Sequence, residues 1–192
     1  MMKITLLLLF LSLSIAVTGC KKKEEGAEYQ GTEGAVTALQ DANQIEAQFK
    51  EVIARDPKNY DAIVSLGNLY FDTGRTEKSI EMYQRALEID PNDVDVRTDM
   101  GTMYRKMGNS DKAIEEFRKS TTIDPKHEMS WYNLGTTLYY DKKDLKGAAD
   151  AWEKLLNVNP DYPDAEGLKQ IISQAKIPQT SEPKSPASGW VK

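Results

Sequence analysis

The sequence predicts an all-α fold, a solenoid built from repeated pairs of helices. Its first evidence is spacing: Asp56-Pro57, Asp90-Pro91 and Asp124-Pro125 lie 34 residues apart, and Asn159-Pro160 follows after 35. Each proline follows an apolar stretch, and because proline cannot continue a helix, each one marks a helix end. Between the prolines the same residue types return in phase with this period, which is typical of stacked helical repeats.

Composition limits the other classes of protein. The chain has 192 residues, of which 40% are hydrophobic and 29% charged, and its net charge is −5. This length allows one domain with short appendages. Nucleic acid is not the expected partner, because phosphate binding needs a basic surface. A single cysteine, Cys20, and a single histidine, His127, leave no basis for a disulfide or for a metal site, so we expect no metal and no cofactor.

Residues 1–19 have the pattern of a bacterial lipoprotein signal peptide. Lys3 precedes an apolar stretch from Ile4 to Val17. At about 1.5 Å per residue this stretch is too short to cross a hydrocarbon core of about 30 Å, and it fits the central region of a secretory signal. The segment Val17-Thr18-Gly19-Cys20 resembles the lipobox, which implies that Cys20 is lipidated and becomes the first residue of the mature protein. The alternative is an ordinary secretory signal with an incidental cysteine.

Residues 20–33 are expected to form the lipidated cysteine and a flexible tether rich in lysine, glutamate and glycine. Lys21 follows the cysteine, which resembles the pattern of enteric-type lipoproteins that are released to the outer membrane. The resemblance implies a protein of the bacterial cell envelope, anchored by lipid and facing the periplasm, with the outer membrane favoured over the inner one in a Gram-negative host.

Each period contains a Leu/Met-Gly pair or its equivalent, a following aromatic or apolar residue, a small residue and a second aromatic. These residues are Leu66-Gly67, Tyr70, Tyr83 and Ala86; Met100-Gly101, Tyr104, Ala113 and Phe117; and Trp131, Leu134-Gly135, Leu138, Ala148 and Trp152. The pattern resembles that of the tetratricopeptide repeat (TPR) family. The resemblance implies three full repeats, at 58–91, 92–125 and 126–160, stacked into a right-handed superhelix whose first helices line a concave surface.

In the first repeat, Gly67 has no side chain, so the second helix can approach closely. Gly74 and Gly108 suit the turn between the helices. Lys142 replaces that glycine in the third repeat, so we expect a turn of different shape there.

The flanks are expected to cover the ends of the repeat array. Residues 34–57 are interpreted as a degenerate helix pair whose second helix presents Ile45, Phe49 and Val52 to the first repeat. Residues 161–176 read as an amphipathic capping helix, and residues 177–192, rich in proline and serine, as a disordered tail.

The concave surface is predicted to bind a protein or peptide. Its lining follows stripes at i, i+4 and i+7 on the first helices. The predicted groove residues are Val64, Asn68 and Phe71; Thr98, Thr102 and Arg105; and Tyr132, Asn133, Thr136 and Tyr139.

Among these residues, Phe71, Tyr132 and Tyr139 suit an extended or helical ligand. Asn68 suits a ligand backbone, and Arg105 suits a carboxylate. The alternative for Phe71 and Tyr139 is that they pack against neighbouring repeats as core.

TPR domains that bind the C-terminal carboxylate of chaperones carry basic residues in this groove. Here Val64 stands at the lysine position of the first repeat, and Asp99 replaces the asparagine of the second. Met129 and Asn133 stand at the two basic positions of the third repeat, and Asn68 alone matches. We therefore do not expect a carboxylate clamp.

The leading hypothesis is a membrane-anchored scaffold that binds other envelope proteins. The residues from Trp131 to Leu156 resemble the periplasmic TPR domains of cytochrome c maturation proteins, which implies a role in that process. The alternatives are a pilotin-like or outer-membrane assembly factor, and a regulator of an envelope enzyme. No Ser/His/Asp set, phosphate loop or metal spacing is recognisable, so we expect no enzyme and no catalytic residue, with His127 exposed at a helix start.

Overall fold

The structure, a computed structural model, describes residues 31–176, with the backbone alone described for residues 31–39. The predicted signal peptide, the lipidated Cys20, most of the tether and the C-terminal tail lie outside the described residues. Between residues 31 and 176 no helix combines the length and the apolar character that crossing a membrane requires.

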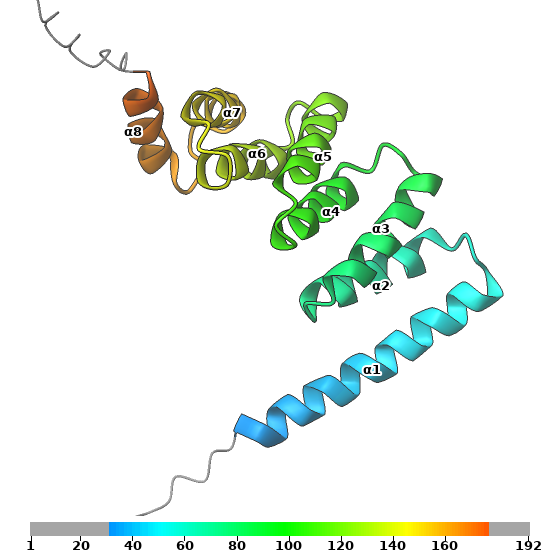
Figure 1. Ribbon diagram of the computed structural model, residues 1–192. Coiled ribbons are helices and arrows are strands. Elements are labelled where there is room, and N and C mark those ends of the chain that lie inside the picture. The colour runs from blue at the N-terminus through cyan, green and yellow to red at the C-terminus, as the bar shows by residue number, and fades with distance from the viewer. Residues whose placement is uncertain (1–30, 177–192) are drawn as a thin grey trace, which may run out of the picture.

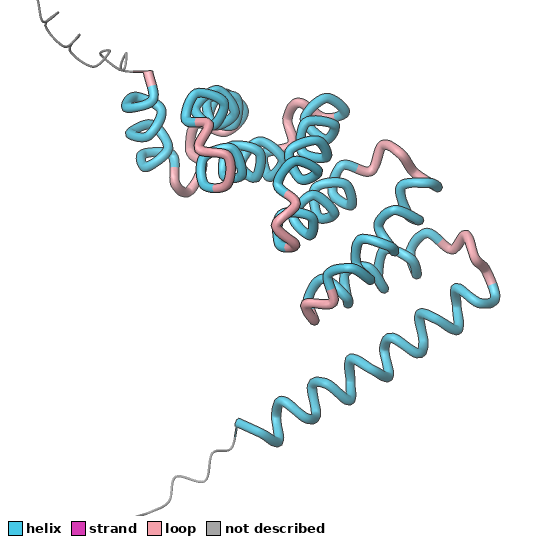
Figure 2. Tube along the Cα trace, viewed as in Figure 1, coloured by secondary structure: helices cyan, strands magenta, loops and turns pink. Residues whose placement is uncertain are grey.

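Eight helices and no strand make up the described part of the chain. They are α1 (Gly31–Arg55), α2 (Tyr60–Asp72), α3 (Thr76–Ile89), α4 (Val94–Lys106), α5 (Ser110–Ile123), α6 (Glu128–Tyr140), α7 (Leu145–Val158) and α8 (Ala165–Ala175). Each helix packs mainly on the helices before and after it in the sequence, so the array extends from α1 at one end to α8 at the other (Figures 1 and 2). The expected solenoid of three helical hairpins, α2–α3, α4–α5 and α6–α7, is confirmed.

The interior of each hairpin is built around one glycine and one aromatic ring. A Cβ atom on Gly67 would lie 2.7 Å from the Tyr83 ring, and one on Gly101 would lie 2.6 Å from the Phe117 ring. Both rings are completely buried, so they have no room to move away. Gly135 faces Trp152 in the same way. The prediction that glycine permits close approach of the second helix is therefore confirmed.

The turns inside the hairpins also follow the glycines. Gly74 and Gly108 adopt φ angles of +70° and +78°, in the left-handed region that glycine enters without steric cost. In the third hairpin Lys143 takes a φ of 57° instead. The turn thus differs in shape there, as predicted. The residue with the left-handed conformation is Lys143 and not Lys142, which replaces the glycine in the sequence pattern.

The N-terminal flank differs from the prediction, because α1 is one continuous helix rather than a helix pair. Residues 35–54 contain neither glycine nor proline, so nothing in that stretch ends a helix. The buried stripe is also shifted by one residue: Ile45 and Val52 are about 40% exposed, at 41% and 40%, whereas Ile53 is buried. Phe49 packs against the core as predicted.

Glu46 is a charged residue within this buried stripe of α1. Its side chain is buried against α2, where its carboxylate accepts hydrogen bonds from the Tyr70 hydroxyl at 2.9 Å and pairs with Lys50 at 2.6 Å and with Arg75. The hydrogen bond from Lys50, with those from Arg75 and Tyr70, lowers the pKa of Glu46 to about 2. The paired carboxylate of Glu46 thus lies in the buried stripe, where hydrophobic patterning predicted the neighbouring Ile45.

The core consists of two clusters that meet within the second repeat. One is formed by α1 to α4 and includes Ile63 and Met103, and the other is formed by α5 to α8 and includes Phe117 and Leu155. Polar contacts accompany this boundary, among them the ion pair between Arg97 and Glu116 at 2.7 Å, in which both side chains are largely buried.

Candidate interaction surface

The first helices α2, α4 and α6 carry all ten predicted groove residues. In α2, Val64 and Phe71 are half-buried and pack against the first core cluster. Asn68 is exposed, and its amide oxygen accepts a hydrogen bond of 2.7 Å from the hydroxyl of Tyr83 in the second helix. Asn68 is therefore held in a fixed orientation on the surface.

The prediction for Thr98 in α4 is wrong, because this side chain is 1% exposed and lies in the interior. Its hydroxyl hydrogen-bonds with those of Ser120 at 3.2 Å and Ser130 at 2.7 Å. The next repeat therefore covers the position that the helical period assigned to the groove. Thr102 is half-buried, and its hydroxyl donates to the Thr98 carbonyl at 3.1 Å.

Arg105 does meet a carboxylate, but it is that of Asp141 in the same chain. The two N–H groups of its guanidinium lie 2.8 and 3.2 Å from the two carboxylate oxygens. The hydrogen bonds from Arg105 keep the pKa of Asp141 below its usual value. This bidentate pair occupies the groups that a ligand carboxylate would need, which corrects the expected role of Arg105.

The aromatic residues of α6 combine the two interpretations that the sequence left open. Tyr132 and Tyr139 are half-buried and pack against the second core cluster. The Tyr139 ring lies 5.5 Å from that of Trp152. Thr136 is half-buried, and the Asn133 amide lies 3.4 Å from the Thr102 hydroxyl. Phe71 and Tyr139 thus pack on the core with one side and keep another side exposed.

Acidic residues gather around Asp99 in the middle of this face. Burial, together with the negative charges of Asp95, Asp93 and Asp72, raises the pKa of Asp99 to about 6. These carboxylates come from the end of α2, the residue before α4 and α4 itself. Asp95 and Asp99 are four residues apart, so one face of the helix presents both. The spacing of Asp95 and Asp99 is readable from the sequence, and it is the signal that could have identified this acidic face.

A Ser/His/Asp set was not recognisable in the sequence, yet the structure brings one together. The His127 ring lies 2.6 Å from the Ser130 hydroxyl and 2.9 Å from the Asp95 carboxylate. Ser130 is completely buried, and its hydroxyl is shared with Thr98. A nucleophile must reach its substrate, so this set fits a structural tie between α4 and α6. The expectation that His127 is exposed is wrong, since its side chain is 21% exposed.

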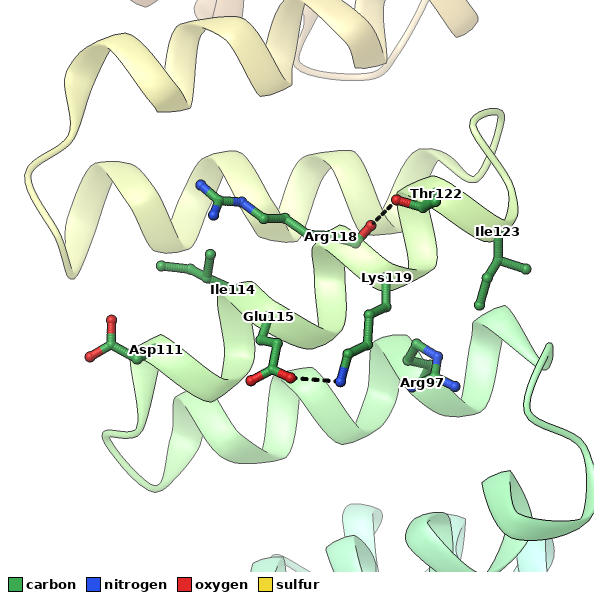
Figure 3. A pocket seen from close by; sticks show the side chains of 8 residues that line it. All are labelled: Arg97, Asp111, Ile114, Glu115, Arg118, Lys119, Thr122 and Ile123. Atoms are coloured by element: carbon green, nitrogen blue, oxygen red, sulfur yellow. Dashed lines mark hydrogen bonds and ion pairs between the residues drawn. The ribbon is translucent and has the colours of Figure 1, made fainter.

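Two depressions of similar size lie near these helices. One, of about 620 Å³, contains the predicted residues Thr102 and Arg105 and lies beside the ion pair to Asp141. The other, of about 600 Å³, lies along α5 and was not predicted (Figure 3). There Glu115 pairs with Lys119 at 2.7 Å, as the dashed line in Figure 3 shows. Because the first depression contains two of the predicted groove residues, the face of the first helices is the stronger candidate site.

No group of ligating side chains suitable for a metal ion occurs among the residues that the structure describes. We find no position among them that would hold a cofactor.

Comparison with known proteins identifies the repeats. Residues 67–108 match a family model described as TPR repeat, and residues 94–127 match one described as tetratricopeptide repeat. No curated protein matches the sequence significantly.

Solved structures resemble the fold. The crystal structure of MamA has a TM-score of 0.63 at 19% identity, covering 72% of this chain and 86% of that one. The first TPR of Spaghetti (RPAP3), bound to the HSP90 peptide SRMEEVD, has a TM-score of 0.56 at 20% identity, covering 62% and 94%. The Sgt2 TPR domain from Aspergillus fumigatus has a TM-score of 0.53 at 28% identity, covering 61% and 76%.

Proposed function

We propose that this chain, whose residues 67–127 carry TPR repeats, is a lipid-anchored interaction scaffold of the bacterial cell envelope. TPR proteins are scaffolds for protein–protein interaction, and they are typically not enzymes. The concave face of the first helices binds a segment of a partner protein. The observation that carries this proposal is that the face of α2, α4 and α6 leaves the polar side chains of Asn68 and Asp95 exposed and that of Thr136 half-buried.

The anchor is the part of the proposal that rests on the sequence. The lipobox-like segment ending at Cys20 supports lipidation, and several acyl chains would hold the protein firmly at a membrane without a spanning helix. Lys21 after the cysteine supports the outer membrane in a Gram-negative host. The array of repeats then faces the periplasm on a short tether.

The resemblance of the residues from Trp131 to Leu156 supports cytochrome c maturation as the pathway, with apocytochrome as the partner. The outer-membrane signal at Lys21 supports instead a pilotin-like or assembly role, in which the partner is a secretin or barrel precursor. A regulator of an envelope enzyme is the third alternative.

Two experiments test the proposal. Metabolic labelling with a lipid precursor in a bacterial host should label the wild-type chain and not Cys20→Ser, and an unlabelled wild-type chain would contradict lipidation. Partner capture from intact envelopes should then compare Asn68→Trp, which fills the concave face without changing charge, with Asn157→Trp on the exposed side of α7.

We expect Asn157→Trp to retain the partners that the wild type captures and Asn68→Trp to lose them. Equal capture by the two variants would show that the partners bind elsewhere. Recovery of apocytochrome, a secretin or a cell-wall synthase distinguishes the three pathways.

A further inference from the structure

We propose that the concave face selects a cationic segment, an extended stretch of a partner protein that carries lysine or arginine. This inference rests on the proposed function and adds the chemistry of the partner. It reverses the charge preference that the chaperone-binding members of the TPR family have.

The charges of the described residues support this choice. The negative charges of Asp72 at the end of α2 and of Asp95 in α4 both act on Asp99. The two arginines of α4 do not neutralise them, because Arg97 pairs with Glu116 and Arg105 pairs with Asp141. No ion pair of Asp99 occurs within residues 40–176, where side chains are described. The face therefore holds net negative charge that an incoming cation would neutralise.

The groups around the carboxylates suit an extended chain as well as its charge. The Asn68 amide lies on the surface of α2 and suits a ligand backbone. Half-buried aromatic rings occur at both ends of the face, with Phe71 on α2 and Tyr132 on α6. Aromatic faces attract lysine and arginine side chains, which adds to the attraction by the carboxylates.

A carboxylate-bearing ligand fits this face poorly. Val64 and Met129 replace basic residues that such a ligand would contact, and Arg105 is already held by Asp141. The peptide in the Spaghetti structure, SRMEEVD, contains three acidic residues. A peptide of that charge would meet Asp95 and Asp99 here, and like charges at short distance disfavour binding.

Acidity should weaken the proposed complex. The pKa of Asp99 is about 6, and the charged groups around it are Asp95, Asp93, Asp72 and His127. Tyr83, which also interacts with Asp99, stays neutral because burial raises the pKa of its phenol. Below pH 6 Asp99 takes up a proton and loses its charge. A cationic segment should therefore bind less tightly at pH 5 than at pH 7.5.

The test uses an unbiased probe, a phage library of random 12-residue peptides panned against the purified full chain in detergent. We expect the enriched peptides to carry net positive charge. Their affinity should fall about tenfold or more in a variant with Asp95→Asn and Asp99→Asn, since two charges are removed. Asn retains the oxygen that accepts from His127, so the fold is preserved. The matched control with Glu88→Gln and Asp150→Asn removes two exposed charges of second helices and should bind normally.

The outcomes separate the inference from the proposed function. Enriched peptides that are neutral or acidic, and that Asn68→Trp excludes, would overturn the charge preference and leave the concave binding face intact. Cationic peptides that bind both double variants equally would also overturn it. An absence of enriched peptides, or peptides that Asn68→Trp does not affect, would overturn the binding face itself and the charge preference with it.

Discussion

The interiors of the three hairpins are alike, whereas the faces of the first helices differ between the same three repeats. Inside, Gly67, Gly101 and Gly135 each meet a large aromatic ring. On the face of the first helices, α2 presents an amide, α4 presents carboxylates and α6 presents tyrosines. The interior must satisfy one packing geometry in every repeat, because each hairpin buries its apolar face against its neighbours. The face of the first helices does not repeat one geometry, and Asn68, Asp95 and Arg105 on it each bond a different partner within the chain.

The largest effect should come from removing an interior ring. Phe117→Ala leaves a cavity opposite Gly101, where the ring is completely buried. We expect the free energy of unfolding to fall by about 3–5 kcal/mol. Met107→Ala, at a side chain that is 49% exposed, is the control and should change it by less than about 0.5 kcal/mol. Urea denaturation followed by circular dichroism measures both, and similar losses would show that the hairpin interiors are not the source of stability.

Placing a side chain between Gly101 and the Phe117 ring should lower the free energy of unfolding by somewhat less than removing the ring does. Gly101→Ala places a methyl group against the buried Phe117 ring, and overpacking of this kind costs about 1–3 kcal/mol. Lys106→Ala, on an exposed position of α4, adds no such contact. If Gly101→Ala were instead as stable as the wild type in urea, the second helix would have room to move away.

Glu46 tests a charged residue in a packed position. Its pKa is lowered from 4.5 to about 2, so ionised Glu46 stabilises the folded state above pH 4.5, and this stabilisation is lost as pH falls toward 2. Glu46→Gln should cost about 1–2 kcal/mol at pH 7, after allowance for solvent screening of the pairs. The cost should vanish in urea titrations near pH 2, and a pH-independent difference would contradict the ion pairs with Lys50 and Arg75.

Asp99→Asn should change the stability at neutral pH in the opposite direction to Glu46→Gln, and by the smallest amount of the four variants. Its pKa is raised from 3.8 to about 6, so the folded state is favoured at low pH and loses stability as pH rises through 6. Asp99→Asn removes this cost and should stabilise the fold by on the order of 1 kcal/mol at pH 7.5, because the partly exposed group is screened. Thermal unfolding at pH 4 and pH 7.5 measures it. A destabilised Asp99→Asn at pH 7.5 would mean that the carboxylate has a partner in the fold.

The repeats were predictable because their signals are local. Prolines end the second helices, and Gly74 and Gly108 mark the turns. The unbroken α1 was missed because a degenerate repeat was expected where no residue ends a helix. The place of Glu46 was missed because its partners Tyr70 and Arg75 lie 24 and 29 residues further along the chain. Helical periodicity describes one helix at a time and does not predict contacts between side chains of different helices.

The candidate site was predictable as a set of helices, and less so residue by residue. Thr98 has the spacing of a groove residue, but Ser130 of the next repeat, 32 residues away, covers it. Arg105 finds its carboxylate 36 residues away. The positions of both depend on how one repeat meets the next. The clustering of Asp72, Asp95 and Asp99 needs that same geometry, although their residue types were visible in the sequence.

The most direct test of the account is to locate a bound peptide on the array by nuclear magnetic resonance. A peptide selected from the random library would be added to the isotope-labelled chain, and the backbone amide shifts would be assigned to helices. We expect the shifts to concentrate in α2, α4 and α6, with the amides around Asn68, Asp95 and Asp99 changing most. Shifts confined to α3, α5 and α7 would contradict it, because the binding surface would then be on the second helices.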